Sequence, residues 1–66
     1  MTTDPDIFRA AKLLIDQRGN EAPMRAARRA DELLEEGDAY GATIWRQIVI
    51  AIEELQRGRR EGERLN

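Results

Sequence analysis

The chain has 66 residues, with 11 Lys and Arg residues against 13 Asp and Glu residues, and a net charge of −2 at pH 7. It has no Cys and no His, which excludes disulfides, thiolate or imidazole zinc sites and the familiar nucleophile–base pairs of hydrolases. A domain this small has a core that contributes only about 3–5 kcal/mol of net stability. We therefore expect no enzymatic activity, no metal and no cofactor, and we expect association with a partner to add stability.

No apolar run approaches the roughly 18 residues that a membrane-spanning helix needs. The first six residues, Met-Thr-Thr-Asp-Pro-Asp, are acidic and polar, the reverse of the basic and apolar start of a signal peptide. Together with the absence of cysteine, these features predict a cytoplasmic protein with no membrane partner.

A first helix is predicted over residues 5–18. Thr3 or Asp4 is its expected N-cap, and Pro5 falls in the first turn, where its missing N–H costs nothing. Apolar residues recur at spacings of three, four and seven and so share one face: Ile7, Phe8, Ala11, Leu14 and Ile15. Gly19 is expected to end the helix in the left-handed conformation.

A second helix is predicted over residues 21–36, with Pro23 in its first turn and Gly37 just past its end. Its expected inward face consists largely of small side chains: Met24, Ala27 and Leu34 beside Ala26, Ala30 and Leu33. Small side chains let a neighbouring helix come close, so we expect tight packing on this face.

Asp38 is the expected cap of a third helix over residues 39–57. A connection of about two residues forces the second and third helices into an antiparallel hairpin. The predicted fold class is therefore all-α, a three-helix arrangement in a single domain over residues 1–57. Residues 58–66 carry alternating charges and two glycines, and they are predicted to form a flexible charged C-terminal tail.

The third predicted helix is apolar over more than half of its circumference, and such a helix is usually covered on two sides. Its candidate protein interface is Tyr40, Ile44, Trp45, Val49 and Ile50. Trp and Tyr beside an apolar strip are typical anchors of protein interfaces; the alternative for Trp45 is a core position. Ile50 lies roughly opposite Ile48 and Ile52, so we expect it to face solvent or a second subunit.

Arg25, Arg28 and Arg29 stand three and four residues apart, which places them on one side of the second helix. Such a patch is typical of contacts with phosphate, in nucleic acid or in an anionic partner. The alternative is a solvated helix face balanced by nearby carboxylates, because Glu21 precedes Arg25 by four and Glu32 follows Arg28 by four. The carboxylates of this face are Glu21, Asp31, Glu32 and Glu35. The thorough interleaving of carboxylates favours the solvated face.

A helix-turn-helix DNA reader needs a polar and basic recognition helix. By position this would be the third helix, yet that helix is the most apolar segment of the chain. Only a narrow outward face is available to reach bases: Thr43, Arg46 and Gln47. We therefore do not expect nucleic acid to be the partner.

Neighbouring carboxylates occur in two places: Glu35, Glu36 and Asp38, and again Glu53 and Glu54. Catalytic carboxylates need burial or a shaped cleft, and three short helices rarely enclose a pocket. Since these residues fall at helix ends or on outward faces, we interpret them as solvated surface groups.

The order of Ala, Leu and Gly residues over about residues 6–57 resembles a group of short, uncharacterised α-proteobacterial proteins of unknown function. Its most specific elements are the pair Gly37-Asp38 and the later Trp45. The resemblance implies a small cytoplasmic helical protein and supplies no active site.

A weaker similarity is to a hairpin of the tetratricopeptide type, through Ala30, Leu33, the Gly37-Asp38 turn and Ala42. Trp45 departs from the register in which that repeat places its aromatic residue, and no second copy is present, whereas about three repeats are needed for stability. The similarity implies tight helix crossing near the turn, with Gly41 at the contact between the two helices.

The predicted function is that of a non-enzymatic helical protein-interaction module. It self-associates, as a homodimer or within a larger complex, or docks on another protein through the apolar face of its third helix. The alternatives are a nucleic-acid-associated regulator that uses the Arg patch, and a small inhibitor or adaptor of another protein. No small-molecule substrate is expected.

Overall fold

A computed structural model describes the backbone of residues 5–65 and the side chains of residues 5–57. Its elements are α1 (Pro5–Arg18), the 3-10 turn η1 (Gly19–Glu21), α2 (Ala22–Glu35) and α3 (Ala39–Leu65). The described part of the chain contains no strand, so the all-α prediction is confirmed. The N-cap predicted at Thr3 or Asp4 lies outside the described residues.

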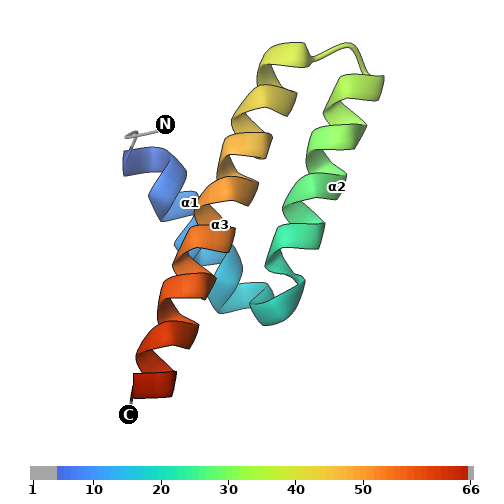
Figure 1. Cartoon of the computed structure of the whole chain (residues 1–66). Helices are drawn as coiled ribbons and strands as arrows, with labels where there is room; N and C mark the ends of the chain where they lie inside the picture. The colour runs from blue at the N-terminus through green and yellow to red at the C-terminus, as the bar shows by residue number, and fades with distance from the viewer. Residues whose placement is uncertain (1–4, 66) are drawn as a thin grey trace.

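The prediction of three separate helices is wrong in one respect. The turn η1 follows α1 and precedes α2 without any intervening loop residue, so α1 and α2 form one bent helical unit beside α3 (Figure 1). Gly19 redirects the chain with a φ of +58°, and the Ala22 N–H donates to the Gly19 carbonyl oxygen. A left-handed glycine therefore turns the chain while hydrogen bonding continues across the bend.

The hairpin between α2 and α3 is built by Gly37 and Asp38, as predicted. Gly37 has a φ of +90°, and its N–H donates to the Leu34 carbonyl at 3.0 Å, while the Asp38 N–H donates to the Leu33 carbonyl at 2.8 Å. These two bonds form a Schellman motif, which ends α2. The Asp38 carboxylate in turn accepts from the Gly41 N–H at 2.8 Å and so caps α3.

The helix α3 continues to Leu65, so the end predicted at residue 57 is wrong. An existing helix adds residues far more easily than a new helix nucleates, and arginine and glutamate are good helix formers. The flexibility predicted for residues 58–66 concerns motion and stays a prediction, and Asn66 lies outside the described residues.

The core lies where α1 and α2 meet α3, and alanine and isoleucine contribute equally to its buried cluster: Ile7, Ala11, Ile15, Ala22, Ala26, Ile48, Ala51 and Ile52. Among the described residues, Ile52 is the largest side chain that is fully buried. The molecule measures 45 × 23 × 15 Å, and a single helix with its side chains is about 10–12 Å across. A body 15 Å thick cannot cover both sides of a helical hairpin along its whole length.

Candidate functional site

The inward face of α2 differs from the predicted one. The buried residues of α2 are Ala22, Ala26, Ala30 and Leu33. Three residues expected to face inward are instead exposed: Met24 and Leu34 by 57% and 49%, and Ala27 as well. The apolar arc of α2 is wider than α3 and α1 together cover, so one edge of the arc is left in solvent.

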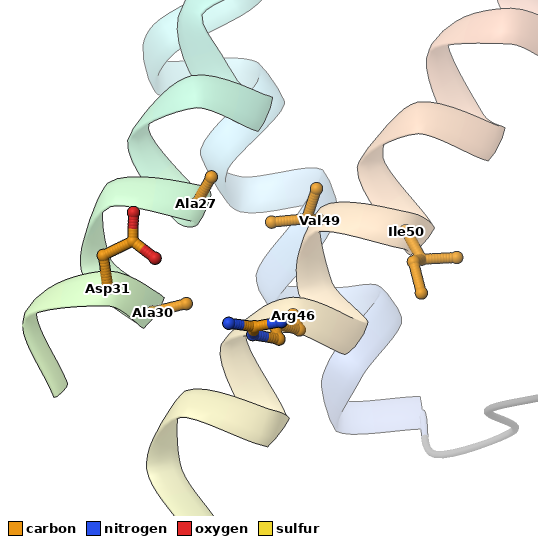
Figure 2. A pocket seen from close by; sticks show the side chains of 6 residues that line it. All are labelled: Ala27, Ala30, Asp31, Arg46, Val49 and Ile50. Atoms are coloured by element: carbon orange, nitrogen blue, oxygen red, sulfur yellow. The ribbon is translucent and has the colours of Figure 1, made fainter. Parts of the chain in front are cut away.

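A shallow groove runs between α2 and α3 along this exposed edge (Figure 2). It is lined by Ala27, Ala30 and Asp31 of α2 and by Arg46, Val49 and Ile50 of α3. Figure 2 shows α1 behind the two helices, on the side away from the groove. Ile50 is 57% exposed, in agreement with the prediction that it faces away from the core.

We call the apolar surface of this side the open face. It comprises the groove residues Ala27, Val49 and Ile50 together with the exposed Met24 and Leu34 of α2. On α2 its members follow one another at spacings of three and seven, so they lie on one side of the helix. Val49 is half-buried and also packs against the core. The open face exists because α1 packs on the opposite side of α3.

One residue of each charge lines the groove. Asp31 stands on the α2 wall of the groove and Arg46 on the α3 wall, and both are exposed. No ion pair joins them among the described residues. Sequence reasoning treated Asp31 as a counter-charge to the arginines and Arg46 as a DNA contact; only the packing of α2 against α3 places the two on one groove.

The five residues of the predicted interface do not form one surface. Ile44, Trp45 and Val49 are half-buried and pack against the core, which agrees with the alternative of a core position for Trp45. Tyr40 is 80% exposed, but it lies nine residues before Val49. On an ideal helix nine residues make about two and a half turns, so Tyr40 and Val49 point to opposite sides of α3.

The Arg patch is largely neutralised by carboxylates three or four residues away in the chain. Arg25 pairs with Glu21 at 3.4 Å, as its spacing predicted. Glu32 pairs with Arg29 at 3.2 Å rather than with the predicted Arg28. Two of the three arginines thus face carboxylates in solvent, which is the arrangement expected of a solvated helix face.

The neighbouring carboxylates occupy exposed positions: Glu35, Glu36, Asp38, Glu53 and Glu54. Among residues whose side chains are described, no group of three or more acidic residues is arranged to hold a metal ion. Within the same part of the chain, no helix combines the length and the apolar character that crossing a membrane requires.

A scan against models of protein families, a search of curated proteins and a search of solved structures find no significant match. The resemblance to uncharacterised α-proteobacterial proteins therefore stays a prediction.

Proposed function

We propose that this chain is a small, non-enzymatic helical module that binds protein through the open face. One observation carries the proposal: three large apolar side chains, Met24, Leu34 and Ile50, are about half or more exposed on the uncovered side of one hairpin. Contiguous apolar surface rimmed by polar groups is typical of protein interaction sites. The predicted interface lay on the third helix alone, whereas α2 and α3 both contribute residues to the open face.

The free energy gained by burying the exposed apolar side chains indicates the affinity to expect. Full burial of a side chain of this kind is worth about 1.5–3 kcal/mol, so burying the exposed halves of the three side chains contributes roughly 2–5 kcal/mol in total. Association opposes this with a loss of translational and rotational freedom of at least about 4 kcal/mol. Further contacts by Ala27, Val49 and the two charged groove residues, Asp31 and Arg46, are therefore needed. We expect an affinity nearer micromolar than nanomolar.

The proposal is tested by capture from nuclease-treated and untreated lysates of the native cell with three tagged proteins: the parent, Ile50→Asp and Leu13→Asp. Leu13 is the matched control, because it is also 57% exposed but lies on α1, behind the open face. We expect partners, including untagged copies of the chain, to be lost with Ile50→Asp and kept with Leu13→Asp. Burying an unpaired aspartate in the interface has a large cost, and circular dichroism checks that both variants remain helical.

Two outcomes would contradict the proposal. Partners that bind Ile50→Asp as well as the parent would show that the open face is not the interface. Partners present in untreated lysate and absent after nuclease treatment would move the function to nucleic acid and to Arg25, Arg28 and Arg29.

A further inference from the structure

We infer that the occupant of the open face is a second copy of this chain, related by a two-fold axis that runs along the groove between α2 and α3. In this arrangement α2 of each copy lies against α3 of the other. The two hairpins stack as two layers of two helices, and α1 of each copy lies on the outer side of its own hairpin. The inference rests on the proposed function and specifies its partner.

The charges that border the groove select this axis. Two copies placed face to face about a two-fold axis present the same surface to each other. An axis along the groove sets the α2 wall of one copy on the α3 wall of the other, so Asp31 meets Arg46 of the second copy. An axis across the groove would set α2 on α2 and α3 on α3, so Asp31 would not meet Arg46 at any level. At the level of Asp31 it would place this residue against a second Asp31, and like charges juxtaposed across an interface are strongly unfavourable. Only the first axis pairs Asp31 with Arg46.

The shapes of the two walls favour the same axis. The α2 wall is lined by Ala27 and Ala30, whereas the α3 wall carries Val49 and Ile50. Ala27 lies four residues from Asp31 and Ile50 lies four residues from Arg46, in each case one turn further from the hairpin turn. Contact between the two charged residues therefore brings the large Ile50 of one copy onto the small Ala27 of the other. Large side chains then fill the space over small ones on both sides of the axis.

The available area sets the strength of the dimer. The 14 residues of α2 span about 21 Å, and two adjacent helices are about 20 Å wide, which gives a flat footprint of about 400 Å² on each copy. Stable complexes bury about 1,200–2,000 Å² in total, so this dimer falls in the weak class. It is expected at high micromolar to millimolar concentration.

The test exploits the two charges separately. Arg46→Asp places aspartate against Asp31 twice in the proposed dimer, and Asp31→Arg places arginine against Arg46 twice. Each variant alone should therefore associate at least about tenfold more weakly than the parent. In an equimolar mixture of the two variants, both contacts between unlike copies become attractive again, so the mixture should recover the affinity of the parent. Sedimentation equilibrium at concentrations up to about 1 mM measures all three samples.

The outcomes distinguish the two-fold arrangement, self-association in general and the proposed function. Recovery in the mixture, with Ile50→Asp monomeric and Leu13→Asp dimeric, supports the proposed dimer. A parent dimer whose charge variants associate unchanged, or whose mixture does not recover, overturns this two-fold arrangement. A parent that stays monomeric at every concentration overturns self-association; the proposed function then survives if capture of a different protein still depends on Ile50, and it fails if that capture is also independent of Ile50.

Discussion

Replacement of Gly41 by alanine has two opposing effects on stability. Alanine favours the helical conformation, and its Cβ crowds the Asp38 carboxylate that caps α3. Gly41 lies in the first turn of α3, and its N–H donates to Asp38 Oδ1 at 2.8 Å. A Cβ added at Gly41 would lie 2.5 Å from Asp38 Oδ2 and 2.9 Å from Asp38 Cγ, so the capping carboxylate would have to move. The nearest atoms that an added Cβ would meet therefore belong to the cap of its own helix and not to the facing helix.

The magnitudes of the two effects nearly cancel. Alanine in place of glycine within a helix is worth up to about 1 kcal/mol, and loss of an aspartate cap costs typically about 1 kcal/mol. Gly41→Ala should therefore change the free energy of unfolding of the parent by less than about 0.5 kcal/mol. In a chain that already carries Asp38→Ala, the cap is absent, and the same change should stabilise by about 0.5–1 kcal/mol. The coupling energy between the two sites is then about 1 kcal/mol.

Urea unfolding of the parent, both single variants and the double variant measures this coupling. All four proteins are compared at one concentration, because self-association would raise the apparent stability. Thr43→Ala in the same two backgrounds is the control, since the Thr43 hydroxyl donates to the Ala39 carbonyl and does not bond Asp38. If Gly41→Ala stabilises both backgrounds equally, to within about 0.3 kcal/mol, the carboxylate does not crowd this position and the reasoning is refuted.

Two further predictions concern the places where the chain changes direction. Gly37→Ala should lower the free energy of unfolding by about 1–2 kcal/mol, purely through the backbone, because φ is +90° and an added Cβ meets nothing within 4 Å; a parent-like thermal midpoint would contradict the left-handed C-cap. Gln56→Ala should cost about 0.5–1 kcal/mol, since Gln56 Nε2 donates to the Gly19 carbonyl at 3.0 Å and ties α3 to the bend. Hydrogen exchange should accelerate at residues 19–22 in that variant, and unchanged protection there would show that the tie is not formed.

Local signals in the sequence were sufficient to predict the course of the backbone around the hairpin. Gly37 and Asp38 act through their own conformations and through hydrogen bonds to residues at most five positions away. Interactions of this range depend on residue type and spacing alone, so the end of α2, the start of α3 and their antiparallel pairing were predicted before the tertiary structure was considered. The pairing of Glu21 with Arg25 is of the same kind.

The candidate site was only partly predictable. The outward position of Ile50 follows from helical periodicity, because it falls opposite the stripe of Ile48 and Ile52. The neighbours of Ile50 across the groove come from α2. Periodicity gives the width of the apolar arc of α2, but it does not show which edge of that arc α1 and α3 cover. Periodicity also does not show which apolar residues of α3 are buried, so the predicted interface combined Tyr40 with residues that pack against the core.

Sequence by itself determined an all-helical chain, its glycine turns, its Asp38 cap and its lack of cysteine and histidine chemistry. Tertiary structure alone decided that α1 lies on one side of the hairpin, that Met24, Ala27 and Leu34 are left exposed, and that Asp31 and Arg46 share a groove. The physical reason is that hydrogen bonds at helix ends are local and directional. Burial of apolar surface is non-directional, so the side on which a helix is covered depends on where the other helices lie.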